Sequence, residues 1–284
     1  MVKKKLNNIL IGILLLIVLA SVLGPFYWTF LTSVSPSVDL HERPPKWFPS
    51  KISFHHYVSI FKSTSQAAGV SYEFVKGLIN SAIISISVTI IALFLGSLAA
   101  YSIIRLKVPF GKTITLLVLL TQMLPPVVIV IPLYFIASKF NMLDKKSFLI
   151  LTYLAFSLPL AIWILEGYFK TLPASIEESA LIDGCTRLQA LFKIVLPLSG
   201  PALFTAGIFV FLASWNEFLM ALVLTSSLTA KTMPVAIAEF IGRFSTDYGL
   251  MATAGIIGSI PPLFFASIFQ RYMISGITAG SVKE

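Results

Sequence analysis

Six long stretches without a charged residue constrain the fold of this chain more than any other feature of its sequence. Only 12% of the 284 residues are charged, about half the share that a soluble domain carries. About 20 apolar residues are enough for a helix to cross a bilayer, and each stretch reaches that length. The sequence therefore predicts an all-α, polytopic membrane protein with six transmembrane helices, at about residues 9–31, 79–103, 113–137, 147–168, 201–224 and 250–271.

Lysine and arginine in the connecting segments predict the orientation of these helices. Three lysines, Lys3 to Lys5, precede the first span, and the loop 102–112 carries three basic residues and no acidic one. Because basic loops stay in the cytoplasm, both termini and the segment 174–197 are predicted to be cytoplasmic. The loop 139–146, on the predicted outer side, is basic as well and departs from the rule. The net charge of +9 comes from such loops, and no clustered basic face indicates nucleic-acid binding.

The segment 174–197 is a long, partly polar stretch between two apolar spans. Ser175 and Glu178 have the spacing of a capping box, which predicts a short helix from about residue 176. Gly184 is placed to end that helix in a turn that needs a positive φ. The single cysteine, Cys185, lies in this turn and excludes an internal disulfide.

A second short helix is expected after the turn. Its apolar residues recur at i, i+3, i+4 and i+7, the period of one helix face, and are Leu188, Leu191, Phe192 and Val195. The segment is thus predicted to be a helix-turn-helix with a polar rim and an apolar face. Such a shape suits docking into a groove on a soluble partner.

Prolines interrupt the third and fourth spans. Pro125, Pro126 and Pro132 lie in the third, and Pro159 lies in the fourth. Because proline breaks the backbone hydrogen-bond ladder, both helices are expected to be kinked. Kinked helices can bound a cavity that opens and closes, or the prolines are simply tolerated.

The fifth span contains an ionisable residue, Glu217, beside Trp215 and Asn216. A charge at the centre of a bilayer costs about 2.5–3.5 kcal/mol on insertion scales, so it usually faces protein or water. Three roles remain open: a structural hydrogen bond to a neighbouring helix, a polar group lining a cavity or pore, and a direct substrate contact. Glu166, near the inner end of the fourth span, is expected at the membrane interface.

Two patterns that resemble binding sites fail on their spacing. The run 110–113 imitates the end of a phosphate-binding loop, but Leu106 stands where that loop needs a glycine. His55 and His56 have no third ligand nearby and are expected in a solvated loop or a short surface helix rather than a metal site. No catalytic, cofactor or metal residue is predicted.

The 174–197 segment resembles a known motif. Glu178-Ser179-Ala180-x-x-Asp183-Gly184-Cys185, five residues, and Leu191-x-x-Ile194-x-Leu196-Pro197 are similar to the EAA loop of the membrane subunits of ABC importers. Ser179, Cys185 and Leu191 depart from the pattern, all to small or apolar residues. Weaker similarities at 123–134, 157–159, 214–217, 270–272 and the C-terminal tail extend the resemblance over nearly the whole chain, to the smaller six-span subunit of carbohydrate-uptake permeases of the maltose-transporter type.

The resemblance implies an ABC importer transmembrane domain of type I. Its expected partners are a second, different permease subunit, an ATPase dimer that binds ATP and Mg, an external solute-binding protein and a sugar, in the first place an oligosaccharide. The loop 225–249 is expected to touch the binding protein. Contact with the ATPase is expected from Glu178, Ala180, Asp183, Gly184, Leu188, Leu191, Phe192 and Pro197, and from the tail 274–284 through Gly276, Thr278, Gly280 and Lys283. On composition alone, that tail is expected to be flexible.

Several alternatives remain. Glu178 can serve the capping box alone, and Asp183 and Gly184 can be turn formers. A secondary transporter needs intramembrane ionisable residues, for which only Glu166 and Glu217 are candidates. Glycerol phosphate or another small solute is an alternative substrate for the same machinery.

Overall fold

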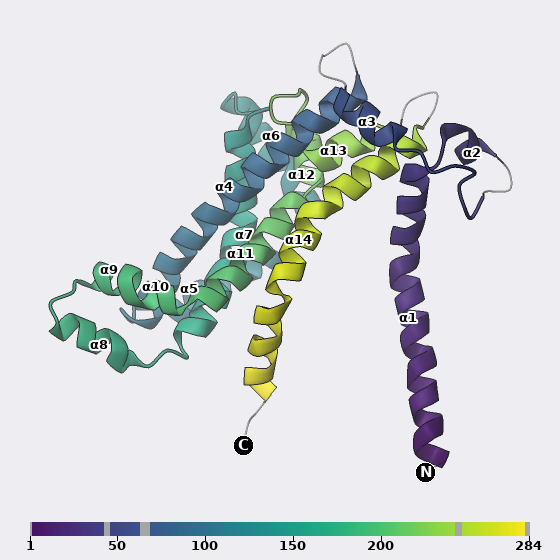
Figure 1. Ribbon diagram of the computed structural model, residues 1–284. Helices are drawn as coiled ribbons and strands as arrows, with labels where there is room; N and C mark the ends of the chain where they lie inside the picture. The colour runs from purple at the N-terminus through teal and green to yellow at the C-terminus, as the bar shows by residue number, and fades with distance from the viewer. Residues whose placement is uncertain (1, 43–45, 63–68, 242–245, 282–284) are drawn as a thin grey trace. The chain divides into compact units, whose positions relative to one another are not determined.

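The computed structural model describes residues 2–42, 46–62, 69–241 and 246–281. Within these ranges the chain is helical, with one isolated bridge between Ile241 and Thr246, which confirms the all-α prediction. The helices, shown in Figure 1, are α1 (Val2–Val34), α2 (Ser37–His41), α3 (His55–Lys62), α4 (Val70–Ile104), α5 (Gly111–Leu120), α6 (Pro126–Lys139), α7 (Lys146–Phe169), α8 (Ala174–Ile182), α9 (Arg187–Ala190), α10 (Leu196–Leu198), α11 (Gly200–Trp215), α12 (Leu219–Leu224), α13 (Met233–Ala238) and α14 (Tyr248–Ser281).

Four helices of the described chain are long and apolar enough to cross a membrane: Asn7–Val34, Ser71–Ile104, Lys146–Phe169 and Tyr248–Ile268. Two bent pairs raise the number to six if each pair is one span. They are Thr113–Met123 with Pro126–Lys139, bent by 95°, and Arg187–Leu198 with Gly200–Trp215, bent by 81°. The fifth span differs from the predicted continuous helix 201–224, because α11 ends at Trp215 and α12 begins only at Leu219.

The bend in the third span follows from its two adjacent prolines. After α5 the chain makes a 3-10 turn (Thr121–Met123), and Leu124 is extended, with ψ 124°. A residue before proline is driven out of the helical region, whereas a proline in the first turn of a helix lacks only an N–H that has no helical partner. Pro126 therefore starts α6. The predicted kink is confirmed here, whereas Pro159 lies inside α7, which runs as one helix.

The chain divides into two compact units, and the larger comprises residues 76–235 and 261–284. Its core lies among α4, α6, α7, α11 and α12 and includes Ile84, Val88, Val210 and Met220. Small residues allow the helices to approach closely, since a β-carbon on Gly96 of α4 would lie 3.3 Å from that of Ala161 on α7. A second cluster joins the ends of α4 and α7 to the 174–197 segment and the start of α11, through residues such as Ala100, Phe169, Leu191 and Ala202.

The loop that follows α12 is fixed to the same unit. Asp144 accepts hydrogen bonds from the backbone N–H groups of Ser226 and Ser227 at 3.1 and 3.0 Å. The side-chain amide of Asn80 donates to the carbonyls of Leu228 and Lys231 at 3.0 and 2.8 Å. Residues 226–231 therefore have a defined conformation.

The smaller unit comprises residues 1–75 and 236–260. The expected short helix is present as α3, but a solvated loop is wrong for His56, which is only 4% exposed. Its Nε2 lies 3.2 Å from the carbonyl oxygen of Ser35, and its ring packs directly against Gly249 of α14, the position where any larger residue would collide with it.

The described part of the C-terminal tail is helical, because α14 continues to Ser281. Each glycine in a helix costs about 1 kcal/mol relative to alanine, but no proline follows Pro262 to stop the helix. Gly276, Thr278 and Gly280 lie within α14, whereas Lys283 lies outside the described residues.

Candidate functional site

The 174–197 segment forms the expected helix-turn-helix. Helix α8 ends at Ile182, and the N–H of Cys185 donates to the carbonyl of Ala180 (3.0 Å) while that of Gly184 donates to Leu181 (3.1 Å). These two bonds form a Schellman motif. Gly184 has φ +89°, a conformation that residues with a β-carbon rarely adopt, so the predicted positive φ is confirmed.

The predicted capping box is wrong. Helix α8 starts at Ala174, the residue before it is Pro173, and no side chain caps it, so Ser175 lies inside the helix. The capping box of this segment belongs to α9, where the Gln189 N–H donates to Thr186 Oγ1 (3.3 Å) and the Thr186 N–H donates to Gln189 Oε1 (2.8 Å). Glu178 therefore does not cap α8, and its carboxylate is exposed.

The second helix also differs from its prediction. After α9 the chain makes a π-helical turn (Leu191–Val195) before α10. The wider turn rotates later residues around the axis, so the four apolar residues do not share one face. Leu191 and Val195 are buried in the core, whereas Leu188 is 60% and Phe192 46% exposed.

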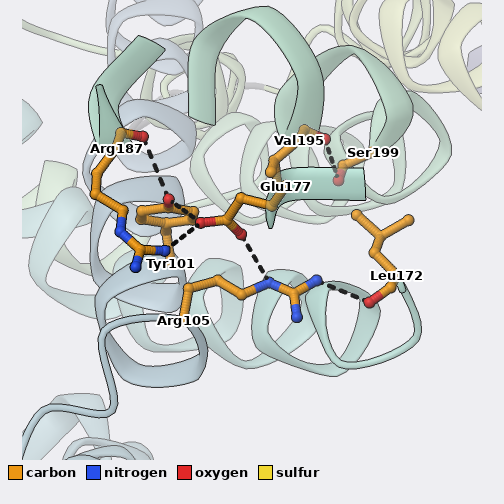
Figure 2. Close-up of polar contacts among 7 residues, drawn as sticks. All are labelled: Tyr101, Arg105, Leu172, Glu177, Arg187, Val195 and Ser199. Atoms are coloured by element: carbon orange, nitrogen blue, oxygen red, sulfur yellow. Dashed lines mark hydrogen bonds and ion pairs between the residues drawn. The ribbon is translucent and has the colours of Figure 1, made fainter. Parts of the chain in front are cut away.

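A buried carboxylate that the sequence analysis did not single out fixes the segment to the larger unit. Glu177 is only 4% exposed, and Figure 2 shows its carboxylate among three partners from two other elements. The Tyr101 hydroxyl of α4 donates to Oε1 at 2.5 Å, Arg187 of α9 contacts the same oxygen at 3.1 Å, and Arg105, just after α4, contacts Oε2 at 3.2 Å.

Arg105 and Tyr101 extend this network to the backbone. Arg105 also donates to the carbonyl of Leu172 at 2.8 Å, and the Tyr101 hydroxyl lies 3.2 Å from the carbonyl of Arg187. The network therefore connects the end of α4 to both helices of the segment and to the chain that leads into it (Figure 2). A buried charge is tolerated when it is paired in this way, and removing one partner is strongly destabilising.

One signal in the sequence could have identified Glu177. It precedes Ala180 by three residues and Leu181 by four, so the three share one face of α8, and Ala180 is 5% exposed. The opposite face carries Glu178 and Ile182. Two adjacent glutamates thus have opposite roles, one inside and one on the surface.

The surface of the segment is both acidic and apolar around its turn. Ile182, at the end of α8, is 86% exposed, and Asp183 and Gly184 follow it on the surface. Of the eight residues expected to contact an ATPase, six are exposed: Glu178, Asp183, Gly184, Leu188, Phe192 and Pro197. The other two, Ala180 and Leu191, are 5% and 0% exposed and support the segment from inside.

Glu217 lies where the fifth span breaks. Its carboxylate accepts the backbone N–H groups of Met220 (2.7 Å) and Ala221 (3.1 Å) and so caps the first turn of α12. Trp215 is 2% exposed and stacks on Phe211 with 5.4 Å between ring centroids, and the Asn216 side chain donates to the Leu212 carbonyl. Trp215, Asn216 and Glu217 are therefore adjacent in the sequence but contact different groups.

A cavity of about 680 Å³ adjoins Glu217. Its walls come from α5, the 3-10 turn, α6, α7, α11 and α12, and Tyr153, Ser157, Trp163 and Ser214 are among the lining residues. Trp215 and Asn216 are not. Glu166 is 5% exposed, and it pairs with Lys170 at 2.7 Å and accepts a hydrogen bond from Thr115 at 3.0 Å. Among the described residues, no group of three or more His, Cys, Asp or Glu side chains could hold a metal ion.

Comparisons with known proteins agree on one family. Residues 92–278 match the family described as binding-protein-dependent transport system inner membrane component. The chain is 38% identical over 269 residues to the trehalose transport system permease protein SugB of Mycobacterium tuberculosis, covering 94% of each chain. It is 34% identical to the trehalose/maltose transport system permease protein MalG of Thermococcus litoralis, covering 97% of this chain and 96% of the relative.

A solved structure supports the fold. A chain of a bacterial ABC transporter involved in the import of the acidic polysaccharide alginate superposes with a TM-score of 0.78 at 19% identity, covering 95% of this chain and 97% of that one. The predicted type I importer fold is thereby confirmed. From the family match and the relatives together, this chain belongs to the inner-membrane components of binding-protein-dependent transport systems.

Proposed function

We propose that this chain is the non-catalytic permease subunit of an ABC importer for a sugar, and that ATP and Mg are bound and ATP is hydrolysed on separate ATPase subunits. The observation that carries the proposal is the 174–197 segment, which is held rigidly at its base and exposes an apolar and acidic surface at its turn. The relatives named for transport of trehalose and maltose supply the substrate class.

The exposed surface of the segment has the composition of a docking site. Ile182 and Leu188 offer apolar side chains on either side of the Gly184 turn, at 86% and 60% exposure. Glu178 and Asp183 add negative charge beside them. An apolar centre with a charged rim is typical of protein interfaces, and an ATPase cleft with a cationic residue facing Glu178 would complement it.

The buried base makes the segment suitable for transmitting movement. Because Glu177 bridges Arg105 and Arg187 (Figure 2), a push on α8 or α9 is passed to the end of α4 rather than absorbed by a flexible loop. Closure of the ATPase dimer would thus move α4 and the helices packed on it. ATP and the binding protein would bias the same two-state element from opposite sides of the membrane.

The remaining parts of the assembly follow from the predicted topology. Both termini and the 174–197 segment are on the cytoplasmic side, and a second, different permease subunit completes the pore. The loop 225–249 faces the external solute-binding protein. The C-terminal part of α14, with Gly276, Thr278 and Gly280, contacts the ATPase subunits, and the same role is proposed for Lys283, which lies outside the described residues.

Co-expression with the ATPase and the second permease subunit tests this proposal. Glu178→Ala and Gly184→Arg are expected to reach the membrane in normal amount but to retain much less ATPase in detergent than the wild type. Lys145→Ala, which removes an exposed charge from the loop between α6 and α7, is the matched control and should retain the wild-type amount. If the wild-type chain retains no ATPase, or if both variants retain all of it, the proposal is wrong.

A further inference from the structure

We propose that the cavity beside Glu217 is a binding site for a neutral sugar during its passage, so that this chain contacts the transported substrate directly. The proposal rests on the proposed function and adds a substrate site to it. The cavity, of about 680 Å³, has the size of small-molecule sites, which are about 300–1,000 Å³. It lies wholly within the larger unit.

Two interruptions of the helical backbone meet at this cavity. Gln122 and Pro126 line it from the two sides of the break in the third span, and Glu217 lines it from the break in the fifth. Non-helical backbone at membrane depth is tolerated only where protein buries it or where it lines a polar cavity. Broken helices that converge on one cavity are the arrangement by which transporters place substrate sites within the bilayer.

Two buried hydroxyl groups of the lining are not satisfied by a hydrogen bond of ordinary geometry. Tyr153 and Ser214 are 2% and 4% exposed, and in the described part of the chain neither hydroxyl makes a hydrogen bond. The Tyr153 hydroxyl interacts with the Glu217 carboxylate, although no hydrogen bond of ordinary geometry joins the two groups. Because an unsatisfied buried polar group is costly, these hydroxyls indicate a ligand that supplies donors and acceptors.

The chemistry of the lining selects a neutral, hydroxyl-rich ligand. None of the residues lining the cavity is a lysine, arginine or histidine, so nothing there would neutralise a phosphate or a carboxylate. Trp163 and Phe156 offer aromatic faces against which the C–H face of a sugar ring can lie. The carboxylate of Glu217, although it caps α12, keeps lone pairs free to accept from sugar hydroxyls.

The test uses the complete transporter in liposomes and measures two quantities in parallel: uptake of radiolabelled trehalose or maltose, and ATP hydrolysis stimulated by the binding protein. Tyr153→Phe and Ser214→Ala each remove one hydroxyl without changing shape. Each is expected to lower sugar uptake per ATP hydrolysed by about fivefold, the effect of one lost hydrogen bond, while the complex retains its ATPase.

Two matched controls separate a sugar contact from a structural role. Tyr134→Phe makes the same change on α6 outside the cavity, and Ser85→Ala removes another buried hydroxyl without a partner in the described chain, on α4. Both should keep the wild-type uptake per ATP. Three outcomes would each overturn the site. Uptake per ATP could fall equally in the control and cavity variants, or it could stay at the wild-type value in both cavity variants. The cavity variants could also lose uptake, ATP hydrolysis and assembly in parallel.

The substrate assignment and the proposed function have separate outcomes. A wild-type transporter that takes up glycerol phosphate but neither disaccharide would overturn the neutral-sugar assignment. Wild-type uptake in both cavity variants, in complexes that retain their ATPase, overturns the site alone. Loss of the ATPase from the wild-type complex overturns the proposed function instead.

Discussion

The contribution of Glu177 to anchoring the 174–197 segment can be worked out partner by partner. Replacing it with alanine leaves Arg105 and Tyr101 without their carboxylate, and breaking a buried charge pair costs about 3–5 kcal/mol. Arg105 keeps its bond to the carbonyl of Leu172, so the lower end, about 3 kcal/mol, is expected. Tyr101→Phe loses a buried hydrogen bond to a charged group, about 2 kcal/mol.

Arg187 contributes less to the stability of the segment than Glu177 or Tyr101. Its side chain is 55% exposed, so water and salt screen its attraction to Glu177, and Arg187→Ala should cost less than about 1 kcal/mol. In local opening equilibria these values correspond to about 150-fold for Glu177→Ala, about 30-fold for Tyr101→Phe and less than about fivefold for Arg187→Ala. Figure 2 shows all three partners around the carboxylate.

Hydrogen exchange of the purified complex measures these openings. The amides of Asp183 and Cys185 are suitable probes, because they donate to the carbonyls of Ser179 and Ala180 at 2.9 and 3.0 Å and exchange only when the segment opens. Lys193→Ala, in the same segment but exposed and outside the network, is the control and should leave their exchange unchanged. If Glu177→Ala accelerates exchange by less than about fivefold, or Arg187→Ala exceeds Tyr101→Phe, the reasoning is refuted.

Three further predictions concern single positions. Gly184→Ala should destabilise the segment by about 1–2 kcal/mol through its positive φ alone, since no atom lies within 4 Å of an added β-carbon; slower exchange of the Cys185 amide would contradict this. Gly249→Ala should lower the melting temperature because the new β-carbon overlaps the His56 ring, and His56→Ala should relieve much of that effect; no relief would disprove the clash. Burial by itself raises the pKa of Asp144, but hydrogen bonds from Ser227, Ser226 and Thr229 outweigh it and lower the pKa below its ordinary value. The stability that Asp144 gives to residues 226–229 is thus fully present above about pH 3.9, the ordinary pKa of an aspartate. It is lost as the pH falls through the lowered pKa of Asp144. Limited proteolysis of this loop measures the effect, and cleavage that already increases at pH 5 would contradict the lowered pKa.

The parts of the fold that depend on local chemistry could be predicted from the sequence. Charge-free runs predicted the membrane helices, adjacent prolines predicted the bend at 124–126, and Gly184 predicted a turn with positive φ. Each of these follows from a few neighbouring residues, so no knowledge of distant contacts was required.

The errors concern features that distant residues determine. The spacing of Glu177 to Ala180 and Leu181 indicates that it lies on the inner face of α8, but its partners Tyr101 and Arg105 are distant in the sequence and could not be predicted. The π-helical turn at 191–195 has the same apolar spacing as an ordinary helix, so its register could not be predicted. Of the three roles left open for Glu217, lining a cavity agrees with the structure, whereas its hydrogen bonds go to the short helix that follows it rather than to a neighbouring helix.

Site-specific cross-linking tests most directly whether the 174–197 segment docks on the ATPase. Ile182→Cys, in a Cys185→Ser background, places a single thiol at the most exposed apolar position of the turn for a photoactivatable cross-linker. Phe140→Cys, in the loop between α6 and α7 and 65% exposed, is the control on the predicted opposite side of the membrane. If the segment docks on the ATPase, Ile182→Cys gives a covalent adduct with the ATPase subunit and Phe140→Cys gives none. A complex that contains the ATPase yet gives no adduct from Ile182→Cys, or equal adducts from both positions, would contradict this docking.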